Sequence, residues 1–452
     1  MNEPSNFCAG ECPSDQSTPW RRMEDKTNFN DIEEGFDPNH PPYLPGRRGG
    51  VSDINEKTVA MDAVQYPGLH YDFHNMYGHS EAVASNKAME TILGERSLVI
   101  GRSTFPGSGV HEGHWLGDNR ATWEDLYYSI PGTITMNMFG IPLVGPDICG
   151  FNGDTNAELC TRWTQLGAFY GFMRNHNTKG AKPQAPYQFG EPYTGYMRTA
   201  IETRYTLLPY IYTLFKEAHV SGTPVNRALF WEFHTSEDGD ISTLASVDTQ
   251  MMLGGALLVT PALKEGDTSV TGYFPKATWY DWFSGAQIVG TVPGNITLEA
   301  PLDTINVHVR GGCIVPSQEH ALDTTAARKN PLNLTVAFNS SGLASGSFFM
   351  DDGVSLDSLS NKKYTEITLE ASCDDNGKSG SVTGTPLEAN FSPDGNATWN
   401  HARILGMAQF PSSGTTYVNG EKTAHQYDES SGVLIVDLPE VPVTEKFTIS
   451  WN

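Results

Sequence analysis

The chain has 452 residues, too many for one hydrophobic core, and this length predicts roughly two to four domains. Its 29 Lys and Arg against 53 Asp and Glu give a net charge of −24, which argues against nucleic acid and anionic membranes as partners and favours a neutral substrate. No run approaches the roughly 20 apolar residues of a membrane span, and the first residues show no signal or anchor pattern.

Glycosylation sequons and cysteines favour a secreted, extracellular glycoprotein. Cys8 and Cys12 flank a Gly-containing turn, and Cys149 and Cys160 bracket a short loop, so each pair is a candidate local disulfide. The sequence leaves open whether Cys313 and Cys373 pair. The alternative to a secreted protein is a cytosolic one in which the six cysteines are reduced, buried thiols. Asn-x-Ser/Thr sequons all fall in the last third of the chain, at Asn295, Asn333, Asn339, Asn390 and Asn396.

In chain order, residues 13–60 come first, with clustered charges, Pro and Gly but no periodicity, and they predict a long loop insertion. From Leu69 to about Val220, short apolar strands alternate with helical segments. We expect strands at 70–74, 97–100, 142–145 and 172–174, and helices at about 80–93, 121–130 or beyond, 157–169 and 199–218. Four such units are half of an eight-stranded barrel, which predicts a partner segment that is missing.

After about Thr223 the helical pattern stops, and alternating strands with turn signals continue to the end, which is typical of β-sandwiches. The polar stretch 318–330 is a candidate boundary. The predicted fold is therefore α/β plus all-β. It consists of the C-terminal half of a (β/α)8 TIM barrel over 1–222, a proximal β-sandwich over 223–320 and a distal β-sandwich over 321–452.

The strongest candidate for a site is Arg102-Ser103-Thr104-Phe105, followed by His114-Trp115-Leu116-Gly117-Asp118-Asn119. A barrel keeps its active site on the loops that follow its strands, and this loop carries Arg, Trp and Asp before a helix. With 53 acidic residues in the chain, a carboxylate alone carries no weight. On spacing alone, Asp118 or Asn119 could equally cap the next helix, and Arg102 could form a structural ion pair.

These two motifs resemble the acid/base region of the α-glucosidases of glycoside hydrolase family 31. The resemblance implies that Asp118 is the general acid/base, and that Arg102 and Trp115 belong to the substrate-binding site. Gly145 to Phe151 also resembles the family, which implies that Asp147 lies in the first sugar subsite and Phe151 at the entrance to the next. The segment from Arg174 to Asn177 also resembles the family, which implies that His176 contacts the first sugar. Considered alone, Asp147 could equally be a buried structural carboxylate, and His176 could equally be an imidazole in the core.

The first residues, Met1-Asn2-Glu3-Pro4-Ser5-Asn6-Phe7, are similar to the second half of the family's nucleophile motif, Trp-x-Asp-Met-Asn-Glu. Because the Asp before Met is the nucleophile in that family, we expect the chain to be a fragment that begins just after it. Glu3 matches a family Glu that supports the site by hydrogen bonding, and we group it with the catalytic residues. The alternative for Glu3 is an exposed terminal glutamate.

The resemblance implies a retaining α-glucosidase that releases glucose from the non-reducing ends of maltose and α-1,4-glucans by double displacement. The expected partners are an oligosaccharide substrate and the missing N-terminal half, without which the isolated chain is expected to be inactive. An α-xylosidase, a glycoprotein-trimming glucosidase or a catalytically inactive carbohydrate-binding chain are the alternatives. No cofactor and no metal are expected, since the cysteines lack the CxxC spacing of zinc sites and we assign no HxxxH spacing to the histidines.

Overall fold

The structure is a computed structural model, and it describes residues 1–6, 36–43, 54–289, 292–374, 377–395, 397–411 and 413–452. The predictions for Phe7, for the Cys8 and Cys12 pair, for most of the 13–60 insertion and for Asn396 lie outside the described residues.

Short parallel strands and longer helices make up the part of the chain before Gly222. Apart from the antiparallel pair Val64–Gln65 and Gly68–Leu69, neighbouring strands pair in parallel, with Gly101 opposite His114, Trp115 opposite Gly145, and Asp147 opposite Arg174. The elements are β1 (Val64–Gln65), β2 (Gly68–Leu69), α1 (His70–Phe73), α2 (Tyr77–Leu93), β3 (Ile100–Gly101), β4 (Gly113–Trp115), α3 (Trp123–Met138), β5 (Val144–Gly145), β6 (Asp147–Ile148), α4 (Ala157–Gly167), β7 (Arg174–Asn175) and α5 (Tyr193–Ser221).

One strand prediction was wrong in this region, and the strands β4 and β6 were not predicted. The segment 70–74 is helical instead of extended, and the rings of His70 and His74, one helical turn apart, share a hydrogen bond of 2.9 Å. Two or three residues are too few to show a period, which is why β4 and β6 were missed. The predicted helices at 80–93, 157–169 and 199–218 correspond to α2, α4 and α5, and the one at 121–130 extends to Met138 as α3.

The helix ends follow capping chemistry. The Asn156 side chain accepts a hydrogen bond from the Leu159 N–H at the start of α4, at 2.9 Å. The 29-residue helix α5 ends just before Gly222, which takes a left-handed conformation with φ of 74°. The Gly222 N–H donates to the carbonyl of Ala218. These caps explain why the helices begin and end where they do.

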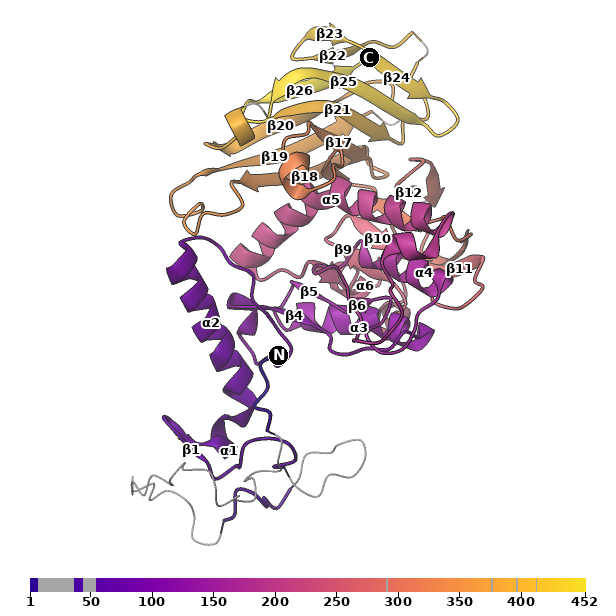
Figure 1. Cartoon of the computed structure of the whole chain (residues 1–452). Coiled ribbons are helices and arrows are strands. Elements are labelled where there is room, and N and C mark those ends of the chain that lie inside the picture. The colour runs from indigo at the N-terminus through magenta and orange to yellow at the C-terminus, as the bar shows by residue number, and fades with distance from the viewer. Residues whose placement is uncertain (7–35, 44–53, 290–291, 375–376, 396, 412) are drawn as a thin grey trace.

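Three sheets follow, and a mostly antiparallel eleven-stranded sheet is the largest (Figure 1). One six-stranded sheet has the order β13-β12-β15-β10-β9-β8, and β11 pairs with β14. The large sheet, called the distal sheet below, has the order β23-β22-β26-β20-β19-β18-β16-β17-β21-β25-β24, and the stretch 318–330 connects its neighbours β16 and β17. The elements of the first two sheets are β8 (Asn226–Arg227), α6 (Leu229–Glu232), α7 (Ile241–Ser246), β9 (Met251–Leu253), β10 (Leu257–Val259), β11 (Ser269–Phe274), β12 (Trp279–Asp281), β13 (Gln287–Val289), β14 (Gly294–Glu299) and β15 (Val307–Arg310).

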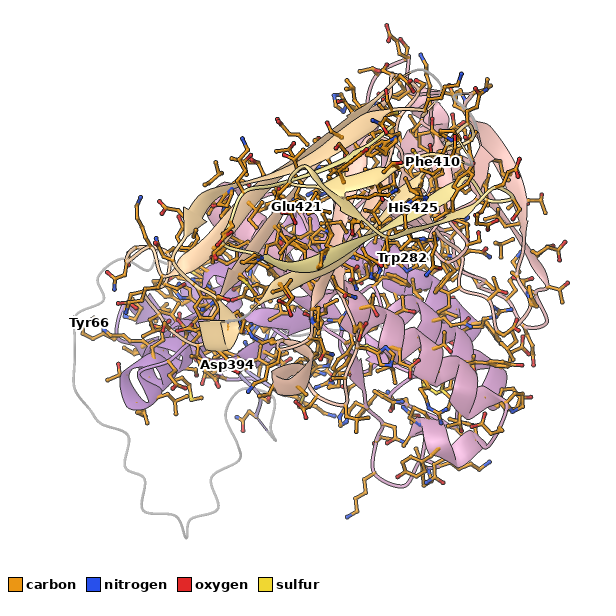
Figure 2. All side chains as sticks on the ribbon, turned by 90° about the horizontal axis from the view of Figure 1, so that it is seen from above. Tyr66, Trp282, Asp394, Phe410, Glu421 and His425 are labelled. Carbon is orange, nitrogen blue, oxygen red and sulfur yellow. A yellow bond between two sulfur atoms is a disulfide. The ribbon has the colours of Figure 1, made fainter. Side chains whose placement is uncertain are left out.

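Burial alternates along the distal-sheet strand Tyr364–Cys373, whose two faces differ in their contact with the core, whereas Leu332–Ala337 is buried throughout. Figure 2 looks onto this sheet from above and shows its long strands lying across the rest of the chain. Its elements are β16 (Cys313–Gln318), α8 (Thr324–Ala327), β17 (Leu332–Ala337), β18 (Leu343–Asp351), β19 (Tyr364–Cys373), β20 (Gly380–Ala389), β21 (Thr398–Leu405), β22 (Thr416–Val418), β23 (Glu421–Thr423), β24 (His425–Asp428), β25 (Val433–Pro442) and β26 (Phe447–Trp451).

The helix α5 joins the two halves, since it lies between the parallel strands and the distal sheet in Figure 1. The Tyr212 hydroxyl donates to Asp351 at 2.6 Å, and the Phe349 N–H donates to the Thr213 hydroxyl at 3.0 Å. Arg96, just after α2, also contacts Asp351, at 2.6 Å. One hydrophobic core runs from α3, α4 and α5 into the six-stranded sheet.

The predicted Cys149–Cys160 disulfide is present and ties the segment after β6 to α4. Cys313 and Cys373 are thiols and are not joined to each other.

Candidate active site

The strand ends bring the predicted site residues to one edge of the parallel strands. Arg102 directly follows β3, Trp115 ends β4, and Asp147 follows the end of β5 by two residues and pairs, as the first residue of β6, with Arg174 of β7. Because parallel strands all end on the same side, residues that are far apart in sequence become neighbours there. Asp118 follows Trp115 by three residues and is carried to the same edge.

Asn2 fixes the loop that carries Arg102. Its side chain is 7% exposed, and its Oδ1 accepts from the N–H groups of Arg102 at 3.0 Å and of Ser103 at 2.9 Å. Its Nδ2 donates to the carbonyl of Ser103 at 2.9 Å and to that of Gly78 at 3.2 Å. The amide therefore joins the first residues, the Arg102 loop and α2. Sequence reasoning quoted Asn2 in a motif but assigned it no role.

Arg102 lies between two carboxylates. Its Nε donates to Oε1 of Glu3, and its Nη1 lies 3.5 Å from Oδ1 of Asp118. Its guanidinium carbon is also 5.8 Å from the centre of the Trp115 ring. Glu3 is thus a partner of Arg102 rather than an exposed terminal residue.

The capping interpretation of Asp118 and Asn119 does not hold. The cap of α3 is Thr122, whose hydroxyl accepts from the Asp125 N–H at 3.2 Å. The Asp118 side chain is 42% exposed, which leaves its carboxyl accessible to a ligand.

Asp147 and Arg174 form the second charged pair. Arg174 Nε donates to Oδ1 of Asp147 at 2.9 Å, and the Asp147 side chain is 1% exposed. Its Oδ2 has no hydrogen-bond partner among the described residues. Burial raises the pKa of Asp147, an effect that the hydrogen bond and charge of Arg174 counter. Sequence reasoning assigned no role to Arg174, whose place opposite Asp147 depends on the strand register.

Trp115 lies beneath both arginines, since the Arg174 guanidinium carbon is 5.4 Å from its ring centre. The ring itself is only 8% exposed. The ring therefore joins the Arg102 and Arg174 sides of the site. Together the ring and the two guanidinium groups form a base that suits a neutral, hydroxyl-bearing ligand.

The loops after β4 and β6 are locked together by Asn119. Its Nδ2 donates to the carbonyl of Asp147 at 2.9 Å, and its Oδ1 accepts from the Phe151 N–H at 3.0 Å. Gly150, with φ of 91°, is needed for this approach, because a Cβ there would lie 2.3 Å from the Ala121 nitrogen. The Asp118 loop is thus held against the Asp147 loop.

The rings of Phe151 and His176 contact each other, with centres 5.2 Å apart. His176 is exposed, so it is not a core imidazole. A polar cavity of about 630 Å³ opens on the Glu3 side of Arg102 and is also lined by Lys57 and His74. Asp118 and Asp147 lie outside that cavity lining.

His70 and His74 have the HxxxH spacing of many metal ligands, so the expectation that the histidines lack this spacing was wrong. Their rings bond to each other, and His70 also bonds to Gln65 at 2.8 Å. In the part of the chain that the structure describes, no group of three or more His, Cys, Asp or Glu could hold a metal ion.

Short parallel strands whose loops carry arginines, carboxyls and a tryptophan, followed by large β-sheets, are typical of part of a β/α barrel with appended β-domains, a fold class that supports many enzyme chemistries. Comparison with known families agrees. Residues 1–214 match the glycosyl hydrolases family 31 TIM-barrel domain, and residues 222–315 match the glycosyl hydrolase family 31 C-terminal domain. The chain belongs to glycoside hydrolase family 31.

Similar proteins include the lysosomal α-glucosidase of Mus musculus, 48% identical over 388 residues, which are 82% of this chain and 38% of that protein. The intestinal sucrase-isomaltase of Homo sapiens is 39% identical over 421 residues, which are 92% of this chain and 22% of that protein. The chain therefore spans well under half the length of these relatives.

Among solved structures, a Tris-bound glucosidase II alpha subunit has a TM-score of 0.79 at 28% identity, covering 88% of this chain and 44% of that one. A family 31 dextranase of Flavobacterium johnsoniae complexed with glucose, at 24% identity and a TM-score of 0.76 over 87% of this chain and 50% of that one, shows the same fold. No helix among the described residues is long and apolar enough to cross a membrane.

Proposed function

We propose that the chain supplies the acid/base side of the active site of a retaining α-glucosidase. The observation that carries the proposal is Asp118, an accessible carboxyl 3.5 Å from Arg102, whose guanidinium shares the Trp115 ring with that of Arg174. The names of the relatives, lysosomal α-glucosidase and sucrase-isomaltase, support the same class of substrate.

In the proposed mechanism, Asp118 protonates the glycosidic oxygen of the substrate while a carboxylate attacks the anomeric carbon. In the second step Asp118 takes a proton from the water that releases glucose. Asp147 accepts a sugar hydroxyl through Oδ2, the oxygen that Arg174 leaves unoccupied. Phe151 and His176 contact the sugar from the exposed side of the site.

The proposal assigns the nucleophile to a carboxylate outside residues 1–452. Two carboxyl groups about 5 to 5.5 Å apart are required for retention. Glu3 is engaged by Arg102, and Asp147 by Arg174, so both are held in supporting roles. The isolated chain is then inactive. Measurable turnover of maltose by purified residues 1–452 alone would contradict this assignment.

The proposed substrates are maltose and α-1,4-glucans, cleaved from their non-reducing ends. A glycoprotein-trimming glucosidase is the second candidate, favoured by the likeness to the glucosidase II alpha subunit. Comparing maltose, nitrophenyl α-glucoside, nitrophenyl α-xyloside and a glucosylated N-glycan with the full-length protein separates these activities. A preference for the xyloside or the glycan would overturn the maltase assignment.

We further propose that the protein is secreted. The Cys149–Cys160 disulfide supports an oxidising compartment, and the sequon residues Asn295 and Asn390 are exposed. Asn333, by contrast, is 7% exposed and is not proposed to carry a glycan.

The decisive test is Asp118→Asn in the full-length protein. We expect maltose hydrolysis to fall roughly 100-fold to 10,000-fold, because the leaving oxygen is no longer protonated. Activated aryl glucosides should lose less, since their leaving groups need less protonation. The matched control is Glu124→Gln, which changes an exposed carboxylate in the first turn of α3. Near wild-type activity of Asp118→Asn on maltose would refute the role of Asp118.

A further inference from the structure

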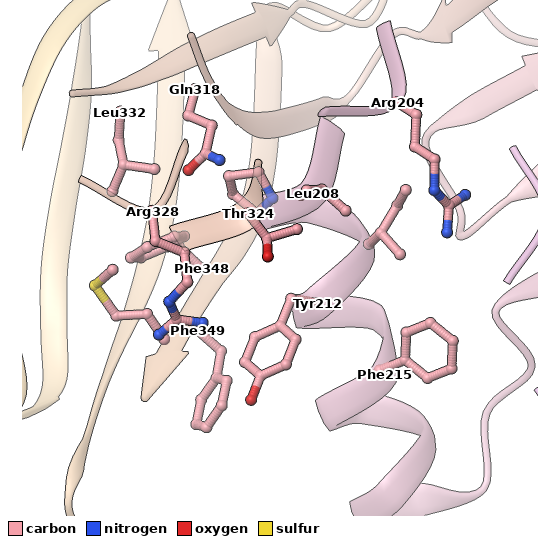
Figure 3. A pocket seen from close by; sticks show the side chains of 13 residues that line it. Arg204, Leu208, Tyr212, Phe215, Gln318, Thr324, Arg328, Leu332, Phe348 and Phe349 are labelled. Carbon is pink, nitrogen blue, oxygen red and sulfur yellow. The ribbon is translucent and has the colours of Figure 1, made fainter. Parts of the chain in front are cut away.

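A second cavity, of about 260 Å³, lies between α5 and the distal sheet, away from the residues of the candidate active site. Its walls are mostly apolar: α5 contributes Leu208, Tyr212 and Phe215, and β18 contributes Phe348 and Met350 (Figure 3). A preformed apolar space between two structural units is a common setting for small-molecule sites.

Polar side chains interrupt these apolar walls, namely Arg204, Tyr212, Gln318, Thr324 and Arg328. Gln318, at the end of β16, is 5% exposed, and its side-chain amide makes no hydrogen bond among the described residues. The amide is not among the enclosed polar atoms that lack a partner, so it faces the open space of the cavity. The Gln318 amide therefore has both a donor and an acceptor left for a ligand.

Arg328, just after α8, provides a positive charge. Its guanidinium donates to the Asp351 carbonyl but forms no ion pair with a carboxylate within the described ranges. Figure 3 shows Arg328 and Gln318 on the distal-sheet side of the cavity, across from Tyr212 of α5. No lining residue is acidic, although the chain as a whole carries a net charge of −24. The local charge of the cavity is thus opposite to that of the protein.

We propose that this cavity binds a compact amphipathic carboxylate, with an aryl or branched alkyl body against α5 and β18 and its carboxylate on Arg328 and Gln318. At just under 30 Å³ per atom, 260 Å³ holds a body of roughly ten non-hydrogen atoms. A sugar is a poor fit, because its hydroxyls would face walls that offer few hydrogen bonds.

Binding here couples two parts of the fold. The ligand touches α5, which packs on the parallel strands, and β18 of the distal sheet at the same time. A ligand that binds only the folded arrangement stabilises it by mass action. The cavity is therefore a stabilising site at the junction of the two units, separate from the chemistry at Asp118.

The test uses 3-phenylpropionate, with 3-phenylpropionamide as its uncharged match, on the full-length protein. We expect one saturable site by calorimetric titration and a rise in unfolding temperature, with the acid bound about tenfold or more tighter than the amide. Arg328→Met should remove that preference. Lys329→Met is the control, because Lys329 pairs with Asp394 at 3.0 Å and does not line the cavity.

A second variant, Gln318→Leu, separates binding from folding. The ligand-free variant should have about the stability of the wild type, because the Gln318 amide makes no hydrogen bond among the described residues that the substitution would remove. It should also bind the acid more weakly. The proposal is overturned by the absence of saturable binding up to about 10 mM, by equal affinity for acid and amide, or by full acid affinity in Arg328→Met.

Discussion

A buried glutamate beneath the candidate site predicts a change of stability with pH. Glu112, just before β4, is 6% exposed, and neither of its oxygens makes a hydrogen bond of good geometry among the described residues. Its carboxyl lies directly against Gly101, where a Cβ would be 1.9 Å from Oε2. Burial raises the pKa of Glu112 to about 7; the Glu81 charge adds to this rise, and the Ser108 hydroxyl opposes it.

The magnitude follows from linkage. Between a value of 4.5 in the unfolded chain and about 7 in the folded one, at about 1.4 kcal/mol for each pH unit, ionised Glu112 costs about 3 kcal/mol. The folded protein binds the extra proton in this range. The stability contribution is therefore complete below pH 4.5 and is lost as the pH rises through about 7.

The test is Glu112→Gln, which keeps the shape and cannot ionise. Urea unfolding of the full-length protein should show similar stability of variant and wild type at pH 4.5, and a gain of up to about 3 kcal/mol for the variant at pH 8. Glu95→Gln, an exposed carboxylate between α2 and β3, should show no such dependence. The reasoning fails if Glu112→Gln gains equally at both pH values or gains nothing at pH 8.

Three further predictions concern the supports of the site. Arg174→Met leaves the buried Asp147 without its partner and should destabilise the protein by about 3 kcal/mol in urea unfolding, and an unchanged midpoint would contradict the pairing. Cys160→Ser opens a disulfide across 11 residues and should cost about 3 kcal/mol, while the same change under reducing conditions should cost almost nothing. Asn2→Ala releases the Arg102 loop and should lower kcat/KM at least about tenfold; unaltered kinetics would show that the loop is held elsewhere.

The long helices could be predicted from sequence because each shows a helical period and a capping signal. Asn156 before α4 and Gly222 after α5 are examples. The strands were harder. β3 and β7 have two residues each, too few for any period, and 70–74 resembles a strand in composition but folds into a helical turn with His70 bonded to His74.

The candidate site was predicted through its motifs and not through its elements. Arg102, Asp118, Asp147 and His176 were each recognised in a short segment that resembles the family. What the motifs could not show is which side chains pair. The Arg174 contact with Asp147 depends on the register of β6 and β7, which no single segment contains.

Motifs predicted the site better than secondary-structure elements did because of how the site's loops are held in place. Strands of two or three residues provide few ladder hydrogen bonds, so the sheet alone cannot fix the loops that follow it. The positions are set instead by side chains that bond to backbone, Asn2 on the Arg102 loop and Asn119 between the Asp118 and Asp147 loops. Since each Asn bridges segments remote in sequence, its replacement should disturb the site while leaving the helices and sheets intact. Residues such as Asn2 and Asn119 can therefore be found through a sequence motif, but not through the hydrophobic period of a helix or strand.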